Sequence, residues 1–367
     1  MCFYYKEDIV RKYYIDNLRW LVILFLFPIH AAVLYTPKAT LSFNINSISE
    51  NPISLLLMLA ITPSMMGLLF LIAGMTTCYS LRRRSYREYL TERTTKLLIP
   101  FLTGLLTVIP YMYYINSLGQ GNSDGFFPFW SSFSHLADIQ HLWFILCLFI
   151  VSVVALIFIV PARSKSFTIP PEKITIPRIL LLMLPFLLLG RFLDFGASVT
   201  LSGAFILILF GYFFFVDDAV QEKLVAKRWL FLGAFVVLTM GNIILYMQGY
   251  QTGYWIANYK VAWFFPYYGM ATQWLGILAL LSLGAKYLEF HNRSTKYMSE
   301  ASFAIYILHY PCLLAVAYIF APLVQNQLLQ YLVIIGVSFI FCIALYEVIR
   351  RIPGLRFLFG IRKPKYR

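Results

Sequence analysis

Ten apolar segments dominate this sequence of 367 residues, and each is long enough to be tested as a membrane span. They run over residues 18–36, 53–80, 97–115, 142–160, 176–190, 199–216, 229–247, 267–284, 301–321 and 328–349, the fifth being the shortest. Because backbone polar groups in lipid need partners within the chain, such segments fold as helices. We therefore expect an all-α, polytopic membrane bundle of about ten transmembrane helices, forming a single domain over residues 1–367.

The positive charges report the orientation of this bundle. Only 13% of the residues are charged, yet the net charge is +14. With the N-terminus inside, 27 of the 30 Lys and Arg residues lie on the inner side, and only Lys38, Arg191 and Lys260 lie outside. The positive-inside rule then predicts that both termini are cytoplasmic in a multi-pass protein of the cell (inner, cytoplasmic) membrane. Topology and attraction to anionic membrane lipids explain the charge, so nucleic acid is not expected as a partner.

One arginine and one histidine stand out in the first apolar segment. Arg19 and His30 are eleven residues apart, so on a helix they share a face to within about 20° and lie about 16 Å apart along the axis. Ionisable groups inside a bilayer are costly, rare and usually functional. We expect Arg19 at a water interface and His30 past the midplane, where an imidazole can act as a general base.

Both residues also have a plainer explanation. His30 can be a hydrogen-bonded packing residue between helices, and Arg19 can be a snorkelling positive-inside anchor. The shared face favours function. Pro28 leaves a helix carbonyl unpaired, which can provide the imidazole with a second partner.

Two further cations precede the third apolar segment. Arg93 and Lys96 are three residues apart, so on a regular helix they share a face, and Pro100 follows them directly. A pair of cations at this place suits phosphate groups. The alternative is further positive-inside charge.

The remaining candidates are spread over the chain. His141 and Trp143 open the fourth segment at the outer face, where a solvated loop histidine and an aromatic-belt residue are the plain alternatives. His309 is a second intramembrane histidine and is followed by Pro311. The five cysteines show no CxxC spacing, so we expect small buried side chains, no disulfide framework and no metal.

In combination, these residues resemble the signature of the acyltransferase 3 family of integral membrane acyltransferases, over nearly the whole chain. The elements that carry the resemblance are Asp16-x-Leu-Arg19 with His30, the segment Phe70–Gly74, Glu92-Arg93-Thr-Thr-Lys96, His141-Leu-Trp143-Phe and Ser302-x-x-x-Tyr306-x-x-His309. The Phe70–Gly74 segment is similar to an aromatic-rich Ser-Gly turn of the family, with alanine in place of serine. Lys96 stands where the family has a second arginine. The chain is most similar to the subgroup that contains glucans biosynthesis protein C.

The resemblance implies O-acyl transfer from a cytoplasmic acyl-CoA to a hydroxyl of an extracytoplasmic glycan or cell-surface carbohydrate, with an acetyl- or succinyl-type group. It implies that Arg19, Arg93 and Lys96 bind the CoA phosphates, although Lys96 lacks the bidentate fork of arginine. His30 would serve as the base on the receiving hydroxyl or as an acyl relay. Supporting roles are expected for Asp16, His141, Trp143 and His309.

Two other classes of protein remain open. A small-solute transporter or flippase explains ten spans and polar residues at depth. It does not explain inner cations aligned with one histidine, and the apolar segments carry no row of carboxylates for proton coupling. The other class is a catalytically inactive relative that binds a lipid or a glycan.

Overall fold

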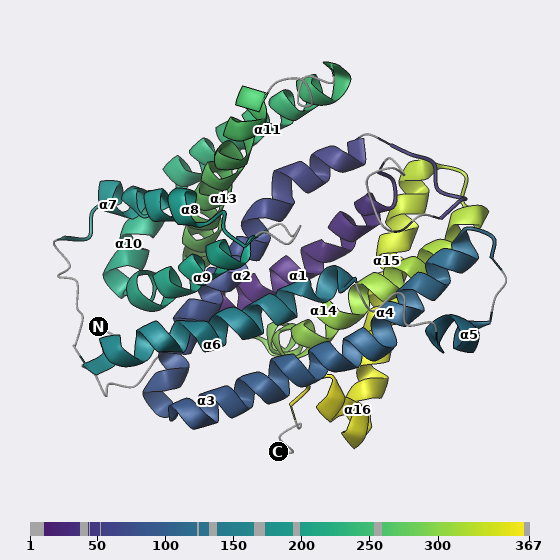
Figure 1. Ribbon diagram of the computed structural model, residues 1–367, viewed down its shortest axis with the longest axis horizontal. Helices are drawn as coiled ribbons and strands as arrows, with labels where there is room; N and C mark the ends of the chain where they lie inside the picture. The colour runs from purple at the N-terminus through teal and green to yellow at the C-terminus, as the bar shows by residue number, and fades with distance from the viewer. Residues whose placement is uncertain are drawn as a thin grey trace. The chain divides into compact units, whose positions relative to one another are not determined.

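The computed structural model describes residues 11–36, 43, 45–51, 53–122, 125–131, 138–164, 173–193, 199–252 and 259–362 (Figure 1). All regular elements in these ranges are helical. They are α1 (Tyr13–Val33), α2 (Ile53–Arg83), α3 (Tyr86–Arg93), η2 (Thr94–Leu98), α4 (Ile99–Gly119), α5 (Phe126–Ser131), η4 (Gln140–Leu142), α6 (Trp143–Ser164), α7 (Ile176–Leu181), α8 (Met183–Leu189), α9 (Leu201–Phe210), η6 (Gly211–Phe215), α10 (Asp218–Ala226), α11 (Arg228–Thr252), α13 (Tyr259–Tyr287), α14 (Arg293–Phe320), η7 (Ala321–Leu323), α15 (Gln327–Arg351) and α16 (Pro353–Leu358).

The chain divides into two compact units, each built from separate stretches of sequence. Unit 1 contains Met1–Arg19, Leu59–Thr91 and Cys147–His291. Unit 2 contains Trp20–Met58, Glu92–Leu146 and Asn292–Arg367. Each unit is described by itself below.

The described residues confirm the all-α, polytopic membrane fold. Each of the ten apolar segments is helical over most of its length, and eight helices are long and apolar enough to cross a membrane alone. The sixth segment, at Leu201–Phe215, passes this test only together with Asp218–Ala226, from which it is bent by 98°. The described chain therefore has eight or nine candidate spans rather than the ten expected.

The fifth segment falls short because it is broken between α7 and α8, which are only 6 and 7 residues long. Pro185 lies just after the break. Its ring clashes with the carbonyl four residues earlier, at Leu181, and it lacks the N–H that would continue the helix. A single regular helix through this proline is therefore disfavoured.

Unit 1 is held together by close helix crossings. Helices α11 and α13 run side by side (Figure 1). Helix α2 crosses the α9–η6 stretch through two glycines, because a Cβ on Gly74 would overlap the carbonyl oxygen of Ile208 and one on Gly211 would overlap that of Leu71. Gly74 lies inside the continuous helix α2, so the Phe70–Gly74 segment forms no turn.

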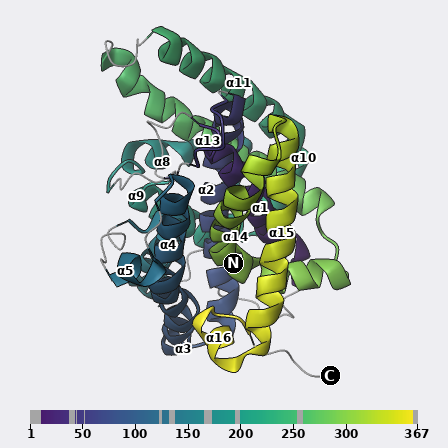
Figure 2. The same cartoon turned by 90° about the vertical axis from the view of Figure 1, so that its right-hand side faces the viewer.

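Unit 2 is built around α14, which contacts both α4 and α15 (Figure 2). Nearly every side chain of α14 from Ala301 to Ala317 is buried. Helix α15 instead exposes large apolar side chains, as expected where the neighbour is lipid; among them are Leu328, Leu332, Ile340, Phe341 and Val348.

Side-chain caps set where these two helices begin. Asn292 accepts the backbone N–H of Thr295 at 2.9 Å, and the Thr295 hydroxyl accepts the backbone N–H of Asn292 at 2.9 Å. This reciprocal pair is a capping box at the start of α14. Asn326 likewise accepts the backbone N–H of Leu329 at 3.0 Å at the start of α15.

The cysteines only partly follow the sequence-based expectation. Cys147, Cys312 and Cys342 are buried free thiols. Cys78 is disulfide-bonded, so the expectation of unpaired cysteines is wrong at this position.

The orientation in the membrane stays a prediction, with a direct test. Alkaline phosphatase is active only outside the cytoplasm, so fusions after Gly125 and after Tyr254, which is outside the described residues, should be active. Fusions after Arg84 and Lys296 should be inactive, because these positions carry the inner positive charge. Activity of the fusion after Arg84 would contradict the proposed orientation.

Candidate functional site

Three histidines from separate parts of the sequence meet inside unit 2. His30 comes from α1, His141 from η4 and His309 from α14. The ring centroid of His309 lies 5.0 Å from that of His30 and 5.2 Å from that of His141. Tyr310 packs at 4.4 Å from the His30 ring and 5.7 Å from the His141 ring. We call His30, His141 and His309 the histidine cluster.

Short-range contacts hold His141 in this place. The hydroxyl of Tyr306 donates to the backbone carbonyl of His141. The residue before it, Gln140, has a φ of 42°, a left-handed conformation that is uncommon for residues other than glycine. Asp138 stabilises this turn by accepting the backbone N–H of Gln140 at 3.0 Å and the hydroxyl of Tyr113 at 2.5 Å.

Backbone carbonyls fix the tautomers of two of these imidazoles. His309 Nδ1 lies 2.6 Å from the carbonyl oxygen of Tyr306, and His141 Nε2 lies 3.0 Å from that of Ile307. A carbonyl oxygen only accepts hydrogen bonds, so the proton sits on His309 Nδ1 and on His141 Nε2 in the neutral rings. The second nitrogen of each ring, His309 Nε2 and His141 Nδ1, then carries a lone pair.

These two nitrogens and Nδ1 of His30 are buried and have no hydrogen-bond partner among the described residues. His141 and His309 are 5% and 0% exposed. The carbonyl freed by Pro28 is thus not a partner of His30 Nδ1, and the expected contact with the imidazole stays a prediction for Nε2 alone. The carbonyl of Pro28 itself accepts the hydroxyl of Tyr331 at 2.9 Å.

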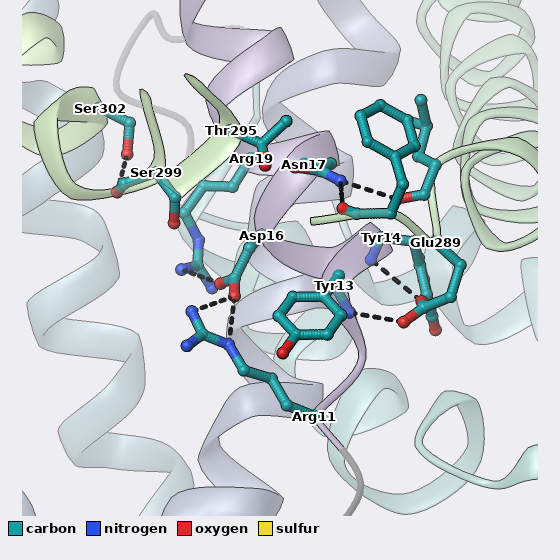
Figure 3. Close-up of polar contacts among 12 residues, drawn as sticks. Arg11, Tyr13, Tyr14, Asp16, Asn17, Arg19, Glu289, Thr295, Ser299 and Ser302 are labelled. Carbon is teal, nitrogen blue, oxygen red and sulfur yellow. Dashed lines mark hydrogen bonds and ion pairs between the residues drawn. The ribbon is translucent and has the colours of Figure 1, made fainter. Parts of the chain in front are cut away.

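Asp16 and Arg19 lie together in unit 1, at the start of α1 (Figure 3). The Asp16 carboxylate is 3.5 Å from the Arg19 guanidinium and 2.6 Å from that of Arg11. Asp16 therefore orients Arg19. Its negative charge in the first turn also stabilises α1 by interacting with the positive end of the helix dipole. Arg19 remains 36% exposed.

The same helix end is anchored by residues far along the chain. Glu289 accepts the backbone N–H groups of Tyr13 at 2.9 Å and Tyr14 at 3.1 Å (Figure 3). The Asn17 amide donates to the carbonyls of Leu288 at 2.7 Å and Phe290 at 2.8 Å. Glu289 thus pairs two of the backbone N–H groups that the start of a helix leaves without a partner within the helix.

Arg93 and Lys96 lie in unit 2, where helix α3 continues through η2 into α4. η2 is a π-helical turn, so the two side chains are not spaced as on a regular helix. Lys96 forms an ion pair with Glu92, and Arg362 lies 3.8 Å from the same carboxylate. Lys96 therefore sits beside a competing negative charge, which the spacing of the cations did not reveal.

The remaining candidate, Trp143, begins α6 and its ring packs at 6.0 Å against that of Phe144. In the described part of the chain, no group of three His, Cys, Asp or Glu side chains has the geometry to hold a metal ion.

Sequence reasoning gave no site role to several residues. Tyr306 was named in the motif with His309, and its spacing of three residues places both on one helix face, but no role was assigned to it. Tyr310 is marked in the sequence only by its position next to His309. Tyr113, Asp138 and Gln140 come together at the turn before His141, and their sequence positions give no sign of it.

Comparisons with known proteins find matches over nearly the whole chain. The model of the acyltransferase 3 family, described as an acyltransferase domain, matches residues 12–347. Proteins named glucans biosynthesis protein C from Salmonella gallinarum and Salmonella paratyphi B are 26% and 25% identical over 385 aligned positions, which is 96% of this chain and 96% of each relative. No solved structure matches the chain.

Proposed function

This chain belongs to the acyltransferase 3 family, and on that premise we propose that it transfers an acyl group from cytoplasmic acyl-CoA to a hydroxyl of an extracytoplasmic glycan or cell-surface carbohydrate, in the cell (inner) membrane. The family and the glucans biosynthesis protein C-like subgroup predicted from the sequence are both confirmed. The observation that supports the proposal most directly is a histidine cluster inside a helical unit of a membrane acyltransferase. The names of the relatives support a glucan as the glycan.

The proposed reaction uses His30 as the general base. A hydroxyl oxygen of the sugar attacks the carbonyl carbon of the thioester, and His30 takes the hydroxyl proton. The carbon–oxygen bond of the new ester forms as the carbon–sulfur bond breaks, and the proton passes to the leaving sulfur to give the CoA thiol. An acyl relay through His30 is the alternative. The imidazole nitrogen attacks the thioester carbon and the carbon–sulfur bond breaks to release the CoA thiol; the sugar hydroxyl then attacks the acyl carbon, and the carbon–nitrogen bond breaks to return the free imidazole.

The direct test is acyl transfer by purified protein in detergent or vesicles. Incubation with acetyl-CoA or succinyl-CoA and a soluble glucan should release CoA thiol and produce an acylated glucan of higher mass. Transport of glucan without consumption of the thioester would instead favour a transporter or flippase.

We propose that Arg19, Arg93 and Lys96 each contribute to binding the phosphates of CoA. Arg93 and Lys96 lie at or beside a π-helical turn, a feature that is frequent at functional sites. Arg19 is oriented by Asp16 and partly exposed. Glu92 holds Lys96 when no phosphate is present, so binding of a phosphate requires Lys96 to exchange one anion for another.

Alanine substitution of each of these cations is expected to weaken CoA binding. Loss of one charge-assisted contact costs about 1.5–3 kcal/mol, which corresponds to an increase in Kd of roughly 10- to 150-fold. Glu92→Gln should instead strengthen CoA binding, because it removes a carboxylate that competes with phosphate for Lys96. Isothermal titration of purified protein with CoA measures both effects.

Arg84→Ala is the matched control, since Arg84 follows α2 and serves as positive-inside charge. It should leave the CoA affinity unchanged. If Arg19→Ala, Arg93→Ala and Lys96→Ala also leave the CoA affinity unchanged, these residues do not bind the phosphates of CoA.

A further inference from the structure

The histidine cluster contains more unpaired hydrogen-bonding capacity than a packed protein interior normally tolerates. His30 Nδ1, His141 Nδ1 and His309 Nε2 are all buried without a partner among the described residues. An unsatisfied buried polar atom is rare in native structures, because it loses its hydrogen bonds to water without replacement. The described residues contain eleven such atoms, and the gathering of three of them in neighbouring rings points to a ligand there.

The chemistry of that ligand follows from the tautomers. The Tyr306 and Ile307 carbonyls take the N–H groups of His309 and His141, so the nitrogens left over can only accept hydrogen bonds while the rings are neutral. A ligand that satisfies them must present hydrogen-bond donors. A fully deprotonated anion such as a carboxylate or a phosphodiester has none to offer, whereas hydroxyl groups and water do.

We propose that His141 Nδ1 and His309 Nε2 bind hydroxyl groups of the sugar that receives the acyl group, and so hold it against His30. This inference rests on the proposed function. The two acceptor nitrogens belong to adjacent rings whose centroids are 5.2 Å apart, and a sugar ring carries several neighbouring hydroxyl donors. His141 and His309 are thus binding and positioning residues, and their backbone hydrogen bonds serve to present the correct nitrogen.

Asparagine and glutamine separate the two nitrogens of each ring. The terminal group of asparagine lies near the Nδ1 position of histidine, and that of glutamine lies near the Nε2 position; an amide group supplies both an oxygen acceptor and an N–H donor. His309→Gln and His141→Asn therefore keep an acceptor where the lone pair is now. His309→Asn and His141→Gln keep only the donor to the backbone carbonyl.

The expected result is a crossed pattern in the glucan KM. His309→Asn and His141→Gln should raise this KM by about 10- to 100-fold, the effect of leaving a buried hydroxyl or its partner unpaired. His309→Gln and His141→Asn should stay closer to the wild-type KM than their counterparts, and the CoA affinity should be unchanged in all four. The reverse pattern, or equal KM values in all four variants, would show that the rings serve packing or hold only water.

A measurement on the unaltered protein covers the case in which a variant does not fold. Diethyl pyrocarbonate modifies imidazole nitrogens that carry a lone pair, and mass spectrometry locates the modified histidines. A soluble glucan should slow modification of His141 and His309, while CoA alone should not. Equal rates with and without glucan, or no modification of either residue, would overturn the proposal.

The outcomes also separate this inference from the proposed function. If wild-type protein acylates glucan but the crossed pattern and the protection are both absent, only the sugar-binding role of the two histidines fails. If wild-type protein consumes no acyl-CoA with any glucan, the proposed function itself fails.

Discussion

Replacing His30 by asparagine is expected to abolish acyl transfer while leaving a folded protein that still binds CoA. An amide cannot take a proton near neutral pH, and loss of a general base costs about 10²- to 10⁴-fold in rate. If His30 is an acyl relay, the loss is complete, because an amide is no nucleophile. The measurement is kcat at saturating glucan and acyl-CoA, with CoA affinity and melting temperature recorded on the same preparation.

His309→Asn is the matched comparison, because His309 is also an intramembrane member of the histidine cluster. That variant should mainly raise the glucan KM, so that transfer returns at high glucan concentration. Near-normal transfer by His30→Asn together with no transfer by His309→Asn would place the catalytic centre on α14 instead of α1.

Gly74→Ala is expected to destabilise unit 1 severely. The added Cβ would overlap the backbone carbonyl oxygen of Ile208, and a backbone atom of a neighbouring helix cannot move aside as the end of a flexible side chain can. Overpacking of a tight core costs about 1–3 kcal/mol and occasionally more, and here two helices would have to separate. The melting temperature in detergent and the yield of monodisperse protein should both fall.

Gly233→Ala is the control for this change, since it lies in α11 of the same unit and an added Cβ there meets no atom within 4 Å. Alanine favours a helix over glycine by about 1 kcal/mol, so this variant should be as stable as the wild type or slightly more stable. Equal melting temperatures for Gly74→Ala and Gly233→Ala would contradict the close crossing of α2 and α9.

The fold was largely predictable because the length of an apolar segment decides whether it can cross a membrane. The exceptions have local causes. Pro185 in the fifth segment is visible in the sequence and accounts for the break between α7 and α8. The bend after the sixth segment follows a π-helical turn at Gly211–Phe215. No simple residue pattern predicts such a turn.

The candidate site was predictable only in part. The spacing of Arg19 and His30 identified one helix face, but it could not show that η4 and α14 bring His141 and His309 to His30. That meeting depends on the left-handed backbone of Gln140, a residue type with no preference for it. The spacing of Arg93 and Lys96 assumed a regular helix and missed both the π-helical turn and Glu92.

The anchoring of α1 has a consequence for how the protein is made. The backbone N–H groups of Tyr13 and Tyr14 find their partner in Glu289, a residue synthesised 276 and 275 positions later. Until Glu289 leaves the ribosome, these N–H groups at the start of α1 have only water or lipid headgroups as hydrogen-bond partners. Helix α1 is therefore synthesised long before it reaches its final hydrogen bonding, and assembly of unit 1 is completed late in translation.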